Sequence, residues 1–244
     1  MYQFFVESEQ VAEEFIQITG SDVNHIRNVL RMKPGEKIRI SDKSGNSFFC
    51  HIEKLEESQV IAAIDEKDEQ GTELANQIVL FQGLPKSDKM ELIIQKAVEL
   101  GACQIVPVEM KNCVVKLDAK KAQSKCSRWQ AISESAAKQS KRTIIPEIGL
   151  PTSWNEAVKL ANELDVVLVP YENERGMEAT REAIRAIQPG QTIGIMIGPE
   201  GGFAEAEIEN LPEKMQRISL GRRILRTETA GLAALSMLVY ELDE

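Results

Sequence analysis

The residues best suited to chemistry lie in the stretch 193–226, where two apolar runs each end in glycine. The first run, 192–198, continues into G-P-E-G-G (198–202), and the second, 215–220, continues into Gly221 and three arginines, Arg222, Arg223 and Arg226. Glycine lets the backbone approach a ligand closely, and open α/β sheets bind ligands beyond the carboxyl ends of their strands. An ordinary strand-to-helix turn would also explain G-P-E-G-G alone, but two such ends followed by arginines predict a binding site.

Several common catalytic motifs are absent. No G-x-G-x-x-G follows a strand candidate, and the chain has neither a P-loop nor a G-x-S-x-G nucleophile elbow. The four cysteines form no C-x-x-C pair and only two histidines are available, which argues against a structural zinc site. No apolar run reaches the roughly 18 residues of a membrane helix, and the N-terminus does not look like a signal peptide. We therefore expect a cytoplasmic protein with no metal and no membrane span.

The charge distribution points to a polyanionic partner although the net charge is -9. Residues 25–43 contain six Lys or Arg and two acidic residues, 111–142 contain nine and two, and 214–226 contain five and none. Basic blocks on an otherwise acidic chain are typical of nucleic-acid binding. Solvated helix faces are the alternative explanation, above all for 111–142.

The pattern of elements indicates two domains, 1–70 and 71–244. The first has one helix, with Val23, Ile26, Val29 and Leu30 on its apolar face, and four strand candidates, 3–6, 37–41, 47–55 and 59–64. From residue 77 strands alternate with helices, which predicts a parallel sheet covered on both faces. Trp129 has the helical spacing of a core residue rather than of a base-stacking platform.

Five motifs in this chain resemble those of the bacterial small-subunit ribosomal RNA uridine-N3 methyltransferases, members of the SPOUT superfamily. They span both domains in the family's order: G-L-P-K-S-D-K-M (83–90), Q-K-A-V-E-L-G (95–101), R-W-Q-A-I-S-E-S-A-A-K-Q-S-K-R-T-I-I-P (128–146), I-G-P-E-G-G-F (197–203) and L-G-R-R-I-L-R-T-E-T-A (220–230). The resemblance implies an N-terminal PUA-like β-barrel that binds RNA and an α/β SPOUT domain tied in a trefoil knot. It also implies a homodimer, S-adenosylmethionine as methyl donor, and a uridine of 16S rRNA in the small ribosomal subunit as target. The knot does not follow from the residues, since topology rules exclude knots as rare.

Carried over by position, the resemblance implies that main-chain groups of three loops hold the donor. These loops contain Leu168, Val169, Pro170, Tyr171, Glu172, Ile197, Gly198, Pro199, Glu200, Gly201, Gly202, Leu220, Gly221, Ile224, Leu225, Arg226 and Thr229. We expect RNA contacts from His25, Arg27, Arg31, Lys86, Lys89, Gln139, Ser140, Arg142, Arg222 and Arg223. A solvated helix face explains the first three of these equally well.

Two residues are candidates for catalysis. A sulfonium donor is already a strong electrophile, so the protein must align uracil N3 and handle its proton. We expect Arg226 to stabilise the uracil anion or bind phosphate, and Glu228 to accept the proton or orient Arg226. A carboxylate favoured by a helix dipole explains Glu228 equally well.

The chain departs from the family pattern at two places. Tyr2 and Gln3 stand where the family often has a basic pair, which weakens the case for an RNA grip at the N-terminus. Ser87 replaces a glycine of G-L-P-K-G-D-K, and either Ser87 or Asp88 could cap the following helix.

Three alternatives to uridine-N3 methylation remain open at this point. Ribose 2′-O methylation would use the same fold and donor on a different nucleophile. A non-catalytic RNA-binding or ribosome-assembly factor would not bind the donor. An enzyme of phosphate ligands could use 198–202 as an anion nest, but the matching Lys-Ser/Thr is missing.

Overall fold

The computed structural model describes residues 1–243 and divides them into two compact units. The first unit contains residues 1–73 together with 137–145, and the second contains the rest. Segment 137–145 is the end of helix α3 (Ala119–Ser140) and the loop that follows it, so the chain passes between the units three times. The expected boundary at residue 70 lies close to the first passage, while the sequence gives no sign of the return through α3.

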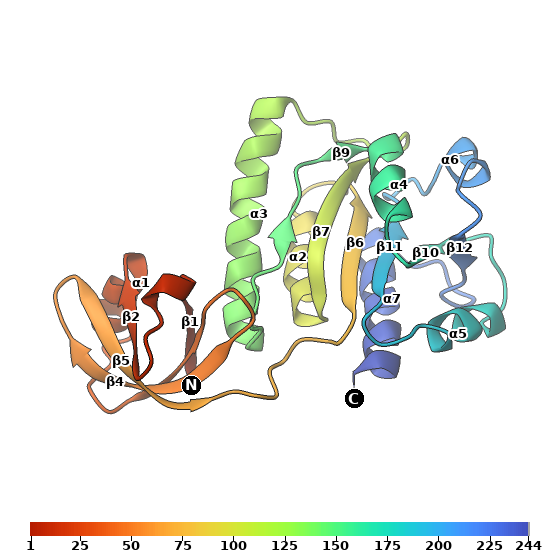
Figure 1. Cartoon of the computed structure of the whole chain (residues 1–244). Helices are drawn as coiled ribbons and strands as arrows, with labels where there is room; N and C mark the ends of the chain where they lie inside the picture. The colour runs from red at the N-terminus through yellow and green to blue at the C-terminus, as the bar shows by residue number, and fades with distance from the viewer. Residues whose placement is uncertain (244) are drawn as a thin grey trace. The chain divides into compact units, whose positions relative to one another are not determined.

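The first unit is built on a curled five-stranded sheet in the order β1-β3-β4-β5-β2 (Figure 1). Its elements are β1 Tyr2–Phe5, η1 Ser8–Gln10, β2 Phe15–Thr19, α1 Ser21–Asn24, η2 His25–Val29, β3 Lys37–Ser41, β4 Ser47–Leu55 and β5 Gln59–Lys67. β1 pairs in parallel with β3, and the other pairs are antiparallel. Alternate residues of the strands fill the core, among them Ile16, Ile18, Ile38, Ile40 and Ile52, each at most 1% exposed.

The helix expected near residue 22 is interrupted. α1 covers one turn and η2, which follows at once, is a π-helix. A π-turn places successive residues at a smaller angle than an α-turn, which shifts the apolar stripe: Leu30 still packs against the core, but Val29 does not. Val23 and Ile26 are buried as expected, but Val29 is 61% exposed, and its predicted core position is wrong.

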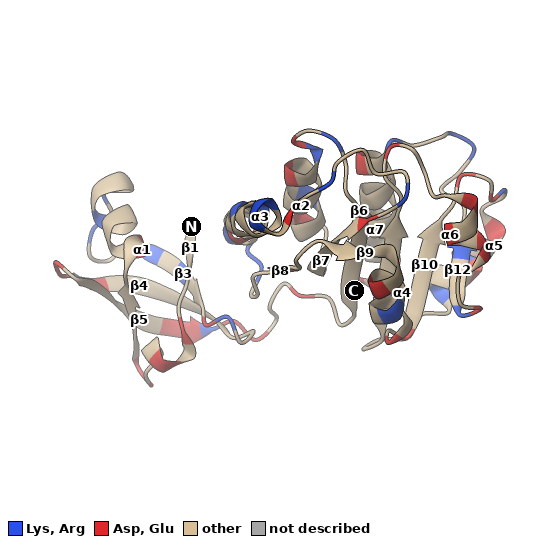
Figure 2. Cartoon of the chain, turned by 90° about the horizontal axis from the view of Figure 1, so that it is seen from above, with Lys and Arg blue, Asp and Glu red and all other residues tan. Residues whose placement is uncertain are grey.

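The second unit is a parallel sheet with helices on both faces. Its elements besides α3 are β6 Gln77–Gly83, α2 Lys89–Glu99, β7 Ala102–Glu109, β8 Glu147–Ile148, β9 Thr152–Ser153, α4 Trp154–Asn162, β10 Val166–Pro170, α5 Glu178–Arg185, β11 Thr192–Ile197, α6 Glu205–Glu209, β12 Met215–Ile218 and α7 Thr227–Leu242. The strand order is β12-β10-β11-β6-β7-β8, with β9 paired to β7. Figure 2 shows α2 and α7 on one face of this sheet and α4 on the other. The expected parallel sheet covered on both faces is confirmed.

The path of the last helix is the unusual feature of this unit. β12 lies at one edge of the sheet, yet α7 returns from it to pack against α2, β11 and β6. The loop after β11 passes directly over the end of β6: a Cβ on Gly83 would lie 2.6 Å from the nitrogen of Pro199. Strand order and the return of α7 are those of the knotted arrangement that the resemblance implies.

Some of the helix caps and core positions predicted for the second unit are confirmed and others are wrong. The Ser153 hydroxyl accepts the Glu156 N–H at 3.3 Å and caps α4. Trp129 is 3% exposed and is a core residue. The capping expected for α2 is wrong, because Asp88 is its N-cap by position but makes no side-chain hydrogen bond there. Across residues 1–243, no helix combines the length and apolarity that a membrane crossing requires.

Candidate functional site

A cavity of about 340 Å³ opens at the carboxyl ends of three neighbouring strands. Its lining includes Pro170 and Ile197, the last residues of β10 and β11, and Ser219, which directly follows β12. These strands are parallel neighbours, so their ends meet at one edge of the sheet. This is the position at which open α/β sheets bind ligands, and both glycine-ended runs of the sequence meet there.

The glycines at this edge have conformations or close neighbours that disfavour a side chain. Gly202 has φ +67°, and a Cβ there would lie 3.3 Å from Oε1 of Glu172. A Cβ on Gly198 would lie 3.3 Å from the carbonyl carbon of Gly202, and Gly221 has φ +107°. The glycines therefore let two loops fold tightly around the cavity with their main-chain groups close to it.

Thr227, the first residue of α7, fastens the cavity loop to the sheet. Its hydroxyl donates to the Gly198 carbonyl at 2.7 Å and accepts a hydrogen bond from Nε2 of Gln82 at 2.9 Å. Gln82 belongs to β6 and is fully buried. One hydroxyl thus joins the loop after β11, the start of α7 and the central strand.

Most residues expected to bind the donor line this cavity. They are Pro170, Tyr171, Glu172, Ile197, Gly198, Pro199, Glu200, Gly202, Leu220, Gly221, Ile224, Leu225 and Arg226. Leu168 and Val169 do not: they are at most 1% exposed within β10. Gly201 turns away and packs against Asn112, whose amide donates to its carbonyl at 3.1 Å. Thr229 is exposed on α7 outside the lining.

The prediction missed part of the lining. The additional residues are Glu174, Arg175, Phe203, Ser219, Thr227 and Ala230, together with Lys89, Arg222 and Arg223, which were expected to bind RNA only. Arg175 follows the expected loop 168–172 by three residues, so extending that loop toward the next basic residue would have found it.

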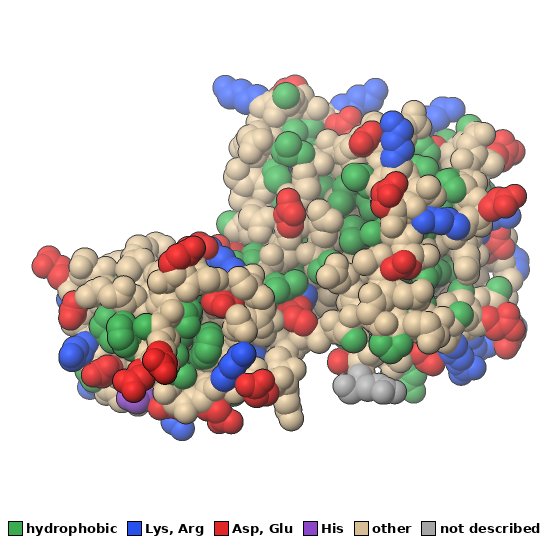
Figure 3. Space-filling model, viewed as in Figure 1, with side chains coloured by type: hydrophobic (Ala, Val, Ile, Leu, Met, Phe, Trp, Pro, Cys, Tyr) green, Lys and Arg blue, Asp and Glu red, His purple; other side chains and the backbone are tan. Residues whose placement is uncertain are grey.

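The side chains of four arginines at the cavity have no polar partner in the part of the chain that the structure describes. Arg175, Arg222, Arg223 and Arg226 all line the cavity, and their guanidinium groups make no hydrogen bond or ion pair within residues 1–243. Glu228, which was expected as a possible partner of Arg226, contacts Lys89 instead. In Figure 3, Lys and Arg side chains project along the upper edge of the second unit, the edge at which the arrows of β6 and β7 end in Figure 1. Cations without carboxylate partners are available to an anionic ligand.

Lys89 lies between two carboxylates at the wall of the cavity. Its Nζ is 3.1 Å from Oε1 of Glu200 and 3.1 Å from Oε2 of Glu228. Hydrogen bonds to Glu200 and, as the second cause, to Glu228 raise the pKa of Lys89 above the ordinary value of a lysine. Burial acts to raise the pKa of Glu200, but the Lys86 N–H, its own N–H and Lys89 outweigh this effect and lower it. This arrangement differs from the phosphate contact expected for Lys89, because its charge is already balanced within the protein.

The loop before α2 brings Lys89 to this position. Ser87 has φ +56°, the left-handed conformation that glycine adopts without strain. The turn directs the Lys86 N–H onto Oε1 of Glu200 at 3.0 Å, while the Lys86 side chain is exposed. Ser87 therefore has no capping role here, which corrects the expectation from the sequence.

The remaining residues expected to bind RNA belong to the first unit. His25, Arg31 and Gln139 are exposed, Ser140 is half-buried, and Arg27 is half-buried and donates to the Glu57 carbonyl at 3.1 Å. The exposed side chains among them are compatible with RNA contact, which stays a prediction.

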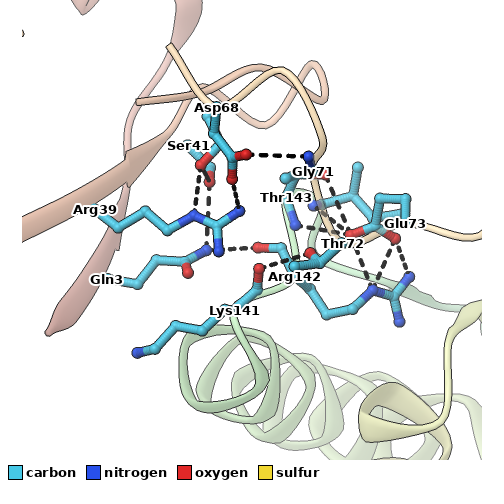
Figure 4. Close-up of polar contacts among 12 residues, drawn as sticks. Gln3, Arg39, Ser41, Asp68, Gly71, Thr72, Glu73, Lys141, Arg142 and Thr143 are labelled. Carbon is cyan, nitrogen blue, oxygen red and sulfur yellow. Dashed lines mark hydrogen bonds and ion pairs between the residues drawn. The ribbon is translucent and has the colours of Figure 1, made fainter. Parts of the chain in front are cut away.

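Arg142 is a structural residue in this fold. Its side chain is 4% exposed, and its Nη2 is 2.5 Å from Oε2 of Glu73 (Figure 4). The same Glu73 carboxylate accepts the N–H of Thr143 at 2.7 Å. The Arg142 carbonyl accepts from Nε2 of Gln3 at 2.5 Å. This burial and pairing argue against the RNA contact expected for Arg142, and they give Gln3 a structural role.

Potential metal ligands do not gather anywhere in the described part of the chain. No group of three or more His, Cys, Asp or Glu side chains within residues 1–243 could hold a metal ion. The four cysteines are free thiols, and two of them, Cys50 and Cys113, are buried.

Comparisons with known proteins agree with the division of the fold. A family model of an RNA methyltransferase domain matches residues 72–239, and a model of an RNA methyltransferase PUA domain matches residues 18–65. Ribosomal RNA small subunit methyltransferase E of Bacillus subtilis is 37% identical over 100% of this chain and 98% of its own length. The protein of that name from Mesomycoplasma hyopneumoniae is 36% identical over 99% of this chain and 100% of its own length.

Solved structures give the same result. Ribosomal RNA small subunit methyltransferase E of Neisseria gonorrhoeae, determined with S-adenosyl methionine bound, has a TM-score of 0.83 and 32% identity. The alignment covers 98% of this chain and 97% of that one. The PUA-like first unit and the SPOUT-type α/β unit expected from the sequence are thereby confirmed. The chain belongs to the RNA methyltransferase family of ribosomal RNA small subunit methyltransferase E.

Proposed function

We propose that this protein transfers the methyl group of S-adenosylmethionine to N3 of a uridine in the 16S rRNA of the small ribosomal subunit. The observation that carries the proposal is the cavity at the carboxyl ends of β10, β11 and β12. It is lined by tight glycine loops and by four arginines whose side chains make no hydrogen bond or ion pair within residues 1–243. A ribosomal RNA substrate also accounts for the basic blocks of an acidic chain and implies a cytoplasmic location.

The cavity suits the methyl donor in size and chemistry. Its volume of about 340 Å³ falls within the range of small-molecule sites. Ile197, Leu220, Leu225 and Phe203 supply apolar walls for a planar base. The tight glycine loops leave main-chain N–H and C=O groups able to bond a nucleoside. When bound, S-adenosylmethionine supplies a methyl group on a sulfonium, an electrophile that needs no activation.

The protein's own task is to orient the uracil ring and to remove the N3 proton. The Glu228 carboxylate, at the start of α7, accepts this proton, and the N3 electron pair then forms the new N–C bond as the sulfonium C–S bond breaks. Arg226, at the N-cap of α7, stabilises the negative charge that uracil carries once N3 is deprotonated. The target base must leave its stack before N3 is reachable, and the free arginines bind the adjoining phosphates.

A homodimer is part of this proposal. In the resembling family the knotted units pair, and a partner would complete each cavity from the side of the loop after β12. Sedimentation of the purified protein tests this part independently of activity, since a monomer would exclude it.

The test of the reaction is direct methyl transfer. Purified protein and labelled S-adenosylmethionine are mixed with small ribosomal subunits from cells that lack this enzyme, and the labelled nucleoside is identified by mass spectrometry. We expect 3-methyluridine. Label in a 2′-O-methyl nucleoside would show that the ribose hydroxyl is the methylated group, while the fold and the donor would stay as proposed. Absence of donor binding would favour a non-catalytic assembly factor.

A further inference from the structure

The contact of Lys89 with two carboxylates has no explanation in RNA binding. A lysine that binds phosphate keeps its ammonium available, whereas Nζ of Lys89 lies 3.1 Å from Oε1 of Glu200 and 3.1 Å from Oε2 of Glu228. The side chains of Lys89, Glu200 and Glu228 are 31%, 25% and 16% exposed. Lys89 and Glu200 line the cavity, whereas Glu228 lies outside its lining and is joined to it through Lys89.

Glu228 depends on this contact more than Glu200 does. Oε1 of Glu200 also accepts the Lys86 N–H at 3.0 Å, which holds it in place without Lys89. Oε2 of Glu228 is buried and makes no hydrogen bond within residues 1–243, so the ion pair with Lys89 is the contact that balances its charge. Removing the ammonium would leave a carboxylate with neither a fixed direction nor a counter-charge.

The three residues also belong to three different segments. Lys89 starts α2, Glu200 lies in the loop after β11, and Glu228 is in the first turn of α7. These segments frame the cavity, and their separation in sequence means that the cluster forms only when all three are folded around it. The carboxylates raise the pKa of Lys89, so its ammonium stays charged at neutral pH.

We propose that Lys89 is a positioning residue for methyl transfer, which holds the Glu228 carboxylate in the direction needed to receive the N3 proton, with Glu200 as the fixed anchor of its ammonium. The inference rests on the proposed function for the identity of the proton, but the geometric role of Lys89 does not. Misplacing a reacting group by about 1 Å can cost roughly 10²-fold in rate, which sets the expected size of the effect.

The experiment compares Lys89→Met, Lys89→Arg, Glu228→Gln and the double variant Lys89→Met/Glu228→Gln in the full-length protein. Single-turnover methyl transfer, RNA affinity and calorimetric binding of S-adenosylmethionine are measured for each. Lys96→Met is the matched control, because Lys96 is also on α2 and ion-paired, with Glu99 at 2.8 Å, but does not line the cavity.

We expect Lys89→Met to lower the single-turnover rate by roughly 10²-fold while changing donor and RNA affinity much less, and Lys89→Arg to restore part of the rate. In the Glu228→Gln background the Lys89 substitution should have little further effect, since a positioning residue acts through its partner. If the two substitutions reduce the rate independently, so that their effects multiply in the double variant, the proposal is overturned. A Lys89→Met variant that loses only RNA affinity would also overturn it, and would indicate that Lys89 binds phosphate.

Hydrogen exchange separates this inference from the proposed function. Lys89→Met should speed amide exchange in the first turn of α7 relative to Lys96→Met, whatever the protein methylates. Suppose that amide exchange in α7 is faster in Lys89→Met, but that the wild-type enzyme methylates an atom other than uridine N3. The positioning role would then stand, and uridine N3 would be refuted as the target. Unchanged exchange in α7 would refute the positioning role even if 3-methyluridine is the product.

Discussion

Replacing Thr227 by valine tests whether one hydroxyl holds the cavity loop to the sheet. Valine keeps the shape of threonine but removes both the bond to the Gly198 carbonyl at 2.7 Å and the acceptor for Nε2 of Gln82 at 2.9 Å. Thr227 is 6% exposed and Gln82 is fully buried, so water does not replace these bonds freely. A buried polar group without a partner costs about 1–3 kcal/mol.

The total cost should stay near the middle of that range. The Gln82 amide keeps its bond to the Gly83 carbonyl at 3.1 Å, and Gly198 lies at the cavity, where water can approach its carbonyl. We therefore expect Thr227→Val to lower the free energy of unfolding by about 2 kcal/mol. For a unit of this size, that corresponds to a decrease in Tm of about 4–8 °C.

Calorimetry of the two variants Thr227→Val and Thr227→Ser provides the measurement. Serine keeps the hydroxyl and should stay close to the wild type, while valine should also weaken binding of S-adenosylmethionine because the Gly198 loop loses its tether. A Thr227→Val variant with the Tm of the wild type and the same affinity for S-adenosylmethionine would refute the reasoning. If Thr227→Ser lowers the Tm as much as Thr227→Val does, the effect comes from lost packing and not from the lost hydroxyl.

Three further predictions concern single side chains. Ser87→Gly should raise the free energy of unfolding by about 1 kcal/mol, because Ser87 holds a left-handed φ of +56° that costs glycine nothing; a shift of the urea midpoint reports it. Arg142→Met should lower stability by about 2–3 kcal/mol in the same assay, less than for a fully buried pair because the Glu73 carboxylate remains 26% exposed. Arg223→Ala should leave stability unchanged but reduce the slope of log affinity for RNA against log salt by about 0.7–0.9, and an unchanged slope would exclude a phosphate contact.

The cavity could be foreseen from the sequence because its parts depend on local signals. The two glycine-ended runs, 192–198 and 215–220, lie on β11 and β12, and residues at their ends line the cavity. β3 and β4 have the bounds expected from residue alternation. β2 was missed although Ile16 and Ile18 alternate with polar neighbours and are buried, so a stricter count of alternation would have found it.

Other features depend on contacts between distant residues and could not be foreseen. The π-turn of η2 exposes Val29, and no local residue signals it. The role of Arg142 is decided by Glu73, which lies 69 residues away in the chain. Likewise the basic block 111–142 is typical of a nucleic-acid surface in the sequence, but the position of Glu73 removes Arg142 from the cations available to RNA.

Pairing therefore separates two kinds of basic residue that composition treats alike. Lys89 and Arg142 form ion pairs with carboxylates, and these pairs stabilise a loop or the end of a helix. Arg175, Arg222, Arg223 and Arg226 have no carboxylate partner within residues 1–243, and all four line the cavity. Like charges gathered in this way repel each other, with a reach of about 8 Å at physiological salt, so the arrangement is unfavourable for folding alone. An anionic ligand with several phosphates would relieve that repulsion. We therefore predict that RNA meets the donor site at these arginines, rather than wherever the total basic charge is high.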